Sequence, residues 1–346
     1  MLNIKIHEIW RHRNETTFRP YLESKDLFRE VGINFIFEGN KFDMEWVGQA
    51  SYINKNKHVN TSVAWGKYYL SKHVKSDYVL FDGQDSATLM GNDTEMLKIG
   101  KGLAIKKNSF YKDRTKYYEP SPHGRIYWDR DKMIDYTLPT KFDFEKVQLS
   151  GCNWLSTLSP NWFKYKQATK DIDVFALFSF PANENYEFDR KTSYYYDHHR
   201  MKCWNYLQTL PKSIKVETLK DGQKVPIDQY YALMSRSKIV VAPFGYGEMA
   251  PRDMESAMVG SILLKPDMGH LETIPNIYLP NETYVPLKWD FSDMNQKITE
   301  TLEGYAEKQD FFVENMRNEY VKQYAKENLV TYTYNWISNL EGYGTN

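Results

Sequence analysis

Short apolar segments of strand length alternate with amphipathic segments of helical spacing along this chain, and the alternation occurs in two separate series. The first series includes the strand-like stretches "INFIFEG" and "DYVLFDG" and a helical stretch over residues 20–32, with Pro20 near its start. The second series includes "DIDVFALFSF", "KIVVAPFG" and "SILLKPD" as its strands. Strands that alternate with helices favour a doubly wound parallel sheet. The sequence therefore predicts an α/β protein with two sheets.

The length of the chain and the positions of its prolines indicate where one domain ends and the next begins. A chain of 346 residues is typical of two domains, and its 41% apolar fraction is ample for packed cores. Four prolines interrupt the irregular region between residues 111 and 170, which indicates loops and a linker. The last residues repeat apolar side chains with helical spacing. We predict two Rossmann-like domains, residues 1–165 and 166–310, and C-terminal helices, residues 311–346, that pack back across them.

The composition excludes several classes of protein. The 45 basic residues balance the 45 acidic residues, so no general attraction to nucleic acid is expected. Cys152 and Cys203 are the only cysteines, too few for a disulfide framework or a CxxC-type zinc site. The N-terminal region lacks the apolar core of a signal peptide, and no apolar run reaches the length of a membrane helix. We expect a cytoplasmic protein with no nucleic-acid partner and no transmembrane segment.

The connection "APFGYGEMAPRDMES" joins a strand to a helix in the second series. In an open parallel sheet, ligands bind beyond the carboxyl ends of strands, where helix N-termini favour anions. Gly245 and Gly247 allow the backbone to approach a ligand closely. Arg252 suits an anionic group such as a diphosphate, and Glu255 is able to accept hydrogen bonds from two neighbouring hydroxyls such as those of ribose. The alternative is a plain glycine-rich connection, because neither a dinucleotide fingerprint nor a P-loop is present.

This segment resembles the C-terminal half of GT-B glycosyltransferases, most closely the exostosin-like and group 1-like enzymes of bacteria and large DNA viruses. Their pattern is roughly S-K-apolar-apolar-x-P-x-G, a small loop, R-x-x-E-A, and then a small residue and G before a strand. Here it reads "SKIVVAPFGYGEMAPRDMESAMVGSILL". A weaker match in the order of elements covers residues 171–293. The N-terminal half matches only as a generic α/β domain.

The resemblance implies a GT-B fold, in which two Rossmann-like domains face a cleft and a C-terminal helical segment follows. Residues 1–165 would bind the acceptor, and residues 166–310 would bind the nucleotide sugar. Glu255 would bind the ribose of the donor.

The same resemblance implies which residues contact the rest of the donor. Gly245, Tyr246 and Gly247 would lie against the diphosphate and the sugar. Arg200, in the helix after the first strand of the second series, would contact the donor phosphates, with Arg190 and Lys191 as the next choices.

One departure from the family pattern bears on the mechanism. Retaining group 1 enzymes carry a glutamate eight residues before the ribose glutamate, but that position is Gly247 here and Glu248 is one residue away. We therefore expect inversion, which needs a base for the acceptor hydroxyl. Asp82 and Asp85, at the end of the strand "YVLF", are the candidates, with Asp85 preferred. The alternative for both is a turn and a helix cap, and His7 and Glu8 are weaker candidates for the base.

The sequence thus predicts transfer of a hexosyl or pentosyl group from a nucleotide diphosphate sugar to a glycan hydroxyl, without a metal or another cofactor. Two alternatives remain. One is a metal-dependent GT-A-type transferase that uses Asp129 and Asp131 of "WDRDK". The other is a two-lobed protein that binds a nucleotide or a sugar without catalysis.

Overall fold

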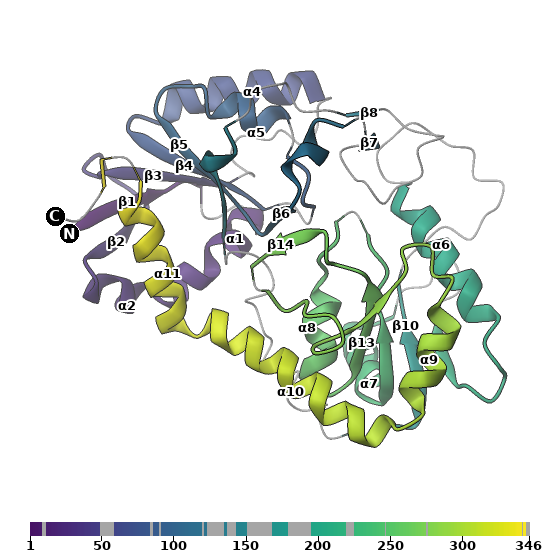
Figure 1. Cartoon of the computed structure of the whole chain (residues 1–346). Helices are drawn as coiled ribbons and strands as arrows, with labels where there is room; N and C mark the ends of the chain where they lie inside the picture. Colours follow the sequence, from purple (N-terminus) through teal and green to yellow (C-terminus); the bar gives the residue numbers. More distant parts are fainter. Residues whose placement is uncertain are drawn as a thin grey trace.

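A computed structural model of the chain describes residues 1–8, 12–48, 59–83, 86–89, 91–119, 121–122, 135–136, 143–150, 168–178, 195–218, 225–245, 247–274, 276–340 and 342–343. Within these residues the chain forms two parallel sheets flanked by helices, followed by two C-terminal helices (Figure 1). The predicted α/β class with two Rossmann-like domains is therefore confirmed.

The first sheet contains six described strands. They are β1 (Leu2–Ile6), β2 (Ile33–Ile36), β3 (Met44–Gly48), β4 (Asp77–Asp82), β5 (Gly102–Lys107) and β9 (Val147–Leu149). The strands are parallel and lie in the order β2–β1–β3–β4–β5–β9. The accompanying helices are α1 (His12–Glu23), α2 (Lys25–Glu30), α4 (Val59–His73) and α5 (Gly91–Met96). Phe18 and Phe28 pack α1 and α2 on one face of the sheet, and Leu70 and Met96 pack α4 and α5 on the other.

The second sheet repeats this arrangement with five described strands. They are β10 (Ile172–Ala176), β11 (Val216–Thr218), β12 (Ser237–Val241), β13 (Ile262–Pro266) and β15 (Val285–Leu287). They are parallel, in the order β11–β10–β12–β13–β15. The helices are α6 (Tyr195–Gln208), α7 (Ile227–Ser235), α8 (Pro251–Met258) and α9 (Met294–Leu302). Leu207 and Ile298 of α6 and α9 belong to one buried cluster, whereas Met234 and Met254 of α7 and α8 belong to another.

Two C-terminal helices connect the second domain back to the first. Helix α10 (Tyr305–Tyr324) packs on the second domain through Met316, and α11 (Lys326–Ser338) lies against the first domain (Figure 1). Trp336 of α11 stacks on Trp46 with ring centroids 5.6 Å apart. The chain therefore returns to the first core after completing the second. The predicted domain boundary at residue 165 lies outside the described residues.

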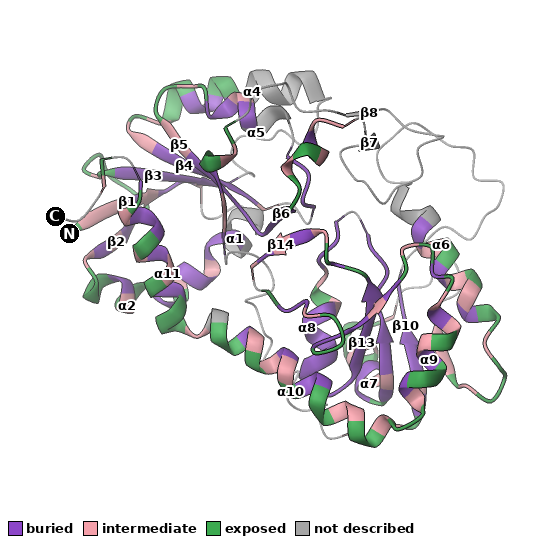
Figure 2. Cartoon of the chain, in the orientation of Figure 1, coloured by how far each residue is buried: buried purple, intermediate pink, exposed green. Residues whose placement is uncertain are grey.

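The two sheets meet at the carboxyl ends of their strands. Strand β6 (Ser109–Tyr111), which follows β5, pairs antiparallel with β14 (Leu271–Thr273), which follows β13. One buried cluster contains Tyr111 and Tyr117 of the first domain together with Phe244 of the second. Figure 2 shows that β13 of the second sheet is buried along its length. Among the described residues, the remaining short elements are two 3₁₀ turns (Arg114–Tyr117 and Phe144–Lys146) and the paired strands β7 (Ser121–Pro122) and β8 (Asp135–Tyr136). The segments that follow β5, β12 and β13 therefore form the contact between the two domains.

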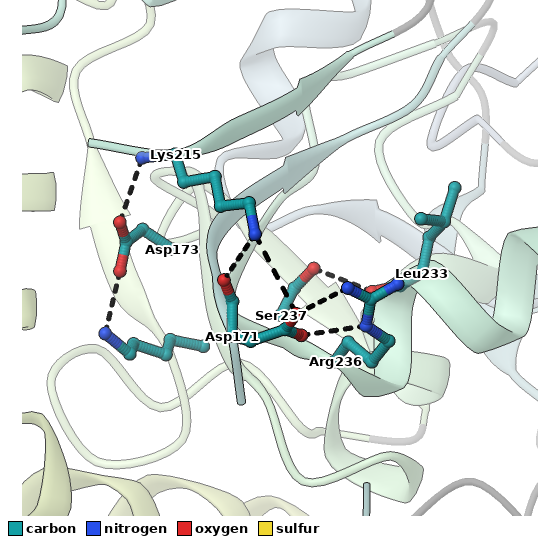
Figure 3. Close-up of polar contacts among 7 residues, drawn as sticks. Asp171, Asp173, Lys215, Leu233, Arg236 and Ser237 are labelled. Atoms are coloured by element: carbon teal, nitrogen blue, oxygen red, sulfur yellow. Dashed lines mark hydrogen bonds and ion pairs between the residues drawn. The ribbon is translucent and has the colours of Figure 1, made fainter. Parts of the chain in front are cut away.

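The opposite, amino-terminal edge of the second sheet is held together by charged side chains (Figure 3). Arg236 Nε donates to Asp171 Oδ1 at 2.8 Å, and the Lys238 ammonium lies 2.7 Å from Asp173. The hydrogen bond from Arg236 lowers the pKa of Asp171 to about 2. These pairs connect the starts of β10 and β12, so this edge serves the stability of the sheet.

One helix differs from its prediction. Residues 20–32 are predicted as a single helix that begins near Pro20, whereas the structure has Pro20 inside α1 and a break at Ser24 before α2. Phe18 and Tyr21 are fully buried. The burial of these two aromatic side chains offsets the cost of a proline within the helix.

Among the described residues, no helix has both the length and the apolar character needed to cross a lipid bilayer.

Candidate functional site

The glycine-rich connection after β12 lies at the carboxyl end of the second sheet. Ala242 continues the sheet by donating its N–H to Leu264 O at 2.9 Å, and the chain then turns, with Gly245 N donating to Gly247 O at 3.0 Å. Helix α8 begins at Pro251, as expected from the preference of proline for the first helical turn. Tyr246 lies outside the described residues.

Arg200 of α6 lies directly against this turn. A Cβ atom added at Gly245 would stand 2.5 Å from Arg200 Nη2, so a larger residue here would have to displace the guanidinium. The glycine therefore allows the guanidinium group of Arg200 to approach the turn closely. Arg200 and Gly245 come from segments 45 positions apart in sequence, and the structure brings these two predicted residues together. Arg190 and Lys191 lie outside the described residues.

The His199 ring is buried beside the turn. Its ring stacks on Phe244 with centroids 5.2 Å apart and packs on Phe291 at 4.6 Å. Burial lowers the pKa of His199 to about 3, so the ring is neutral at physiological pH. His199 therefore supports the wall behind the turn and supplies no charge.

Glu255 lies in the second turn of α8 with 7% of its surface exposed. Its Oε1 accepts a hydrogen bond from the Tyr231 hydroxyl at 3.0 Å, and its Oε2 accepts one from the Tyr230 hydroxyl at 3.2 Å. Both tyrosines belong to α7. Burial raises the pKa of Glu255. Because a carboxylate accepts up to about four hydrogen bonds, the two from tyrosine leave capacity for two ribose hydroxyls.

Arg252 also forms hydrogen bonds within the protein. Its Nε donates to the Tyr230 hydroxyl at 3.2 Å, and its Nη2 donates to the Leu177 carbonyl just after β10 at 2.5 Å. The guanidinium thus fixes the tyrosine that in turn contacts Glu255. The arrangement gives Arg252 a positioning role, and a direct contact with a diphosphate stays a prediction.

Asp253 anchors the start of α8 and was not among the residues predicted from the sequence. The carboxylate is fully buried and accepts hydrogen bonds from the Tyr278 hydroxyl at 2.6 Å and from Ala250 N at 3.0 Å. It also pairs with the buried Lys265 ammonium at 3.0 Å. Burial lowers the pKa of Lys265. No sequence signal joins these residues, since an ion pair between a helix and the following strand has no fixed spacing.

Asp82 ends β4 and is buried. Its carboxylate forms an ion pair with the Lys107 ammonium at the end of β5. The pair joins the ends of two neighbouring strands of the first sheet. A role for Asp82 as the base stays a prediction. Asp85 lies outside the described residues.

A carboxylate–histidine pair lies near the end of β1. His7 Nε2 is 2.6 Å from Glu45 Oε2, and His7 Nδ1 is 3.2 Å from the Tyr69 hydroxyl. Burial alone would raise the pKa of Glu45, but hydrogen bonds from His7 and from two backbone amides lower it. The sequence pointed to His7 as a weaker candidate base but gave no sign of Glu45. Glu8, the residue after His7, has a φ of 45°, which non-glycine residues seldom adopt.

Among the described residues, no group of three or more His, Cys, Asp or Glu side chains is placed to hold a metal ion. Asp129 and Asp131 lie outside these residues.

A surface depression of about 580 Å³ lies after β13 and β15, at the same edge of the second sheet as the glycine turn. Asp267 and Trp289 contribute to its lining. The Trp289 Nε1–H group donates to the Asp267 carbonyl at 2.9 Å, which fixes the indole beside the depression.

Two doubly wound sheets that meet at their carboxyl ends, with a C-terminal helix returning to the first domain, define the GT-B class of fold. No protein-family model and no curated protein matches the chain. Among solved structures, Anabaena HepE in complex with UDP-glucose is similar at 10% identity, 97% coverage of this chain, 100% of that chain and a TM-score of 0.49. A glycosyltransferase from Rickettsia africae is similar at 11% identity, 97% coverage of both chains and a TM-score of 0.48.

An alpha-glucosyltransferase solved with UDP and a 13-mer DNA is similar at 10% identity, 95% coverage of this chain, 99% of that chain and a TM-score of 0.46. The predicted absence of a nucleic-acid partner stays a prediction. All three TM-scores lie below 0.5. They carry no inference about activity, so the fold class rests on the topology of this chain.

Proposed function

We propose that this protein is a glycosyltransferase that moves a hexosyl or pentosyl group from a nucleotide diphosphate sugar to a hydroxyl of a glycan. One observation carries the proposal. The Gly245 turn, the Arg200 guanidinium and the Glu255 carboxylate all lie toward the carboxyl end of the central strands of the second sheet. Open parallel sheets bind their ligands at this edge.

In this proposal each group meets one part of the donor. Glu255, held by two tyrosine hydroxyls, accepts hydrogen bonds from the ribose diol. The backbone of the glycine turn and Arg200 contact the diphosphate. The R-x-x-E spacing of Arg252 and Glu255, shared with exostosin-like and group 1-like enzymes, supports the assignment. The first domain would then bind the acceptor.

The proposed reaction proceeds with inversion. The acceptor hydroxyl attacks C1 of the sugar opposite the leaving group, a base removes its proton, and the nucleoside diphosphate departs with the bonding electron pair. Arg200 and backbone N–H groups of the turn stabilise the charge that develops on the diphosphate, so the proposal requires no metal. Asp85 is the proposed base. The His7–Glu45 pair is the alternative, because a carboxylate that holds a histidine in one tautomer is a common arrangement for proton transfer.

A thermal-shift screen with nucleoside diphosphates tests the donor site. A bound nucleotide raises the melting temperature through RT ln(1 + [L]/Kd), so one base is expected to stand out. Arg200→Ala should reduce this ligand-induced shift. Arg236→Ala should preserve it, since Arg236 pairs with Asp171 at the opposite edge of the sheet. No shift with any nucleotide would contradict the donor site.

The sugar of the best-binding nucleotide is then tested for transfer to a panel of glycans, with and without EDTA. Transfer that persists in EDTA and inverts the anomeric configuration is expected. Loss of transfer in EDTA that manganese restores would instead favour the metal-dependent alternative with Asp129 and Asp131. Binding without either transfer or donor hydrolysis would favour the non-catalytic alternative.

A further inference from the structure

Glu248 immediately follows the glycine turn, and its side chain is fully buried. Its Oε2 accepts a hydrogen bond of 3.0 Å from the backbone N–H of Ala87, which lies 161 positions earlier in the chain. Burying a carboxylate is unfavourable unless hydrogen bonds or opposite charges compensate. Here the hydrogen-bond donor is the Ala87 N–H group of the first domain, so this carboxylate is part of the contact between the two domains.

The Ala87 end of this contact is itself held firmly. The carbonyl of Ala87 accepts a hydrogen bond from the Tyr117 hydroxyl at 2.7 Å, and that hydroxyl accepts one from Tyr111 N at 3.0 Å. The neighbouring hydroxyls of Ser86 and Thr88 lie 2.8 Å apart and are hydrogen-bonded to each other. Residues 86–88 therefore form a fixed loop that presents one N–H group to Glu248.

The Glu248 end is equally constrained. Glu248 lies within electrostatic range of the buried Lys265 ammonium, which pairs with Asp253 at the start of α8. It also lies within electrostatic range of Tyr117 from the first domain. The carboxylate thus occupies a position between the anchor of α8 and the loop that contains Ala87.

We propose that Glu248 is a positioning residue for sugar transfer, and this inference rests on the proposed function. Gly247, next to Glu248, belongs to the proposed donor site, and Asp85, two residues before Ala87, is the proposed base. The Glu248–Ala87 hydrogen bond joins these two segments at one point. It sets the distance between the donor sugar and the group that activates the acceptor. The acidic residue at 248 therefore aligns the domains and takes no direct part in bond making.

Substitutions at Glu248 separate positioning from catalysis. Glu248→Ala removes the acceptor of the hydrogen bond, and a misplacement of about 1 Å can cost about 10²-fold in rate. We expect kcat for transfer to fall at least ~10-fold in Glu248→Ala, with the Kd for the nucleoside diphosphate changed less than ~3-fold. Glu248→Gln keeps an amide oxygen that accepts from Ala87, so it should retain most of the activity. Equal loss in the alanine and glutamine variants would overturn the positioning role.

A matched control lies elsewhere on the same contact between the domains. Glu272 on β14 forms an ion pair of 3.0 Å with Arg114 from the first domain, and both side chains are partly exposed. Glu272→Ala should leave kcat unchanged. A loss like that of Glu248→Ala would overturn the specific role of Glu248, because any weakening of the contact would then suffice.

Amide hydrogen exchange provides a readout that requires no substrate. The N–H of Ala87 should exchange slowly in the wild-type protein and in Glu248→Gln, and faster in Glu248→Ala. If the alanine variant fails to fold, Glu248→Asp replaces it, because aspartate keeps the charge but withdraws the oxygen by one methylene. Unchanged exchange at Ala87 in a variant that removes the contact overturns the inference. A wild-type protein that binds no nucleotide and transfers no sugar refutes the proposed function, while the exchange result still decides whether Glu248 joins the domains.

Discussion

At the scale of single residues, Glu255 is subject to opposing effects. Burial raises its pKa, whereas the Arg252 charge and the hydroxyls of Tyr231 and Tyr230 lower it. The tyrosines therefore hold the carboxylate in one orientation and help to keep it ionised. A carboxylate prepared in this way is able to accept hydrogen bonds from a ribose diol.

Replacement of Glu255 tests the ribose assignment. Glu255→Ala should weaken binding of the nucleoside diphosphate by about 1–3 kcal/mol, because the ribose hydroxyls lose their acceptor. Isothermal titration with the nucleotide and with its 2′,3′-dideoxy analogue measures the effect. The wild-type protein should prefer the natural nucleotide, and the variant should bind both alike. If the variant keeps the wild-type preference, Glu255 does not contact the ribose.

Asp82 and Asp85 should respond differently to the same change. Asp82→Asn removes one partner of the buried pair with Lys107 and should lower the free energy of unfolding by about 3–5 kcal/mol. Asp85→Asn should leave the fold intact and slow transfer by roughly 10²–10⁴-fold, as expected for loss of a general base. Urea unfolding and initial transfer rates measure the two effects. Normal turnover in a folded Asp85→Asn protein would move the base elsewhere, and His7→Gln would then be the next variant.

At the scale of helices and strands, the sequence predicted the strands that contain an uninterrupted apolar run. β4, β12 and β13 each contain at least three consecutive apolar residues, and each was expected. β3 was missed because Glu45 interrupts its apolar pattern, although the carboxylate is buried against His7. β14 was missed because its partner β6 lies more than 150 positions away. Pairing of this kind depends on tertiary contacts that local spacing does not record.

The residues of the candidate site also fall into two groups, those that local sequence patterns predict and those that only tertiary contacts bring together. The glycine turn and the R-x-x-E spacing are local in sequence, so they could be recognised without a structure. The contact between Glu248 and Ala87 joins segments 161 positions apart and has no sequence signature. The tyrosine partners of Glu255 lie 24 and 25 positions away on another helix, where only the packing of α7 against α8 brings them together.

The last helix provides a test at this scale. Trp336 of α11 is 6% exposed, stacks on Trp46 and lies 4.0 Å below the buried Lys106 ammonium. Trp336→Ala should lower the free energy of unfolding by about 3–5 kcal/mol, because it leaves a cavity in the core of the first domain. Phe311→Ala is the control, since Phe311 on α10 is 51% exposed and should change stability by no more than about 0.5 kcal/mol. Equal stability of both variants in urea would show that α11 does not anchor the first domain.

At the scale of the whole molecule, the start of the second domain, the end of α8 and the C-terminal α10 meet around two basic side chains. The Lys170 ammonium donates to Val259 O at 2.9 Å and to Ser261 Oγ at 3.0 Å. Arg317 of α10 donates to Ala257 O at 2.8 Å. Burial, together with the charge of Arg317, lowers the pKa of Lys170 to about 7. Two cations thus share one polar site that connects three parts of the chain.

This site predicts how stability depends on pH. In the folded protein Lys170 loses its proton near pH 7, whereas in the unfolded chain it does so near pH 10.5. Between these values the unfolded state binds more protons, so the free energy of unfolding rises with pH, by up to about 1.4 kcal/mol per pH unit from this group. Below pH 7 Lys170 is protonated in both the folded and the unfolded state, so it contributes no pH dependence to the free energy of unfolding. Urea unfolding of the wild-type protein between pH 7.5 and 9.5 measures the slope.

Lys170→Met isolates the contribution of this amine. Methionine has a similar length but does not titrate, so the variant should lack the part of the slope that Lys170 supplies, whatever its absolute stability. Lys215→Met is the control, because Lys215 is exposed at the charged edge of the same domain and lies 3.8 Å from Asp171. That variant should keep the wild-type slope. Parallel curves for the wild-type protein and Lys170→Met would mean that Lys170 titrates as it does in the unfolded chain, and that the junction between the domains and α10 is open to water.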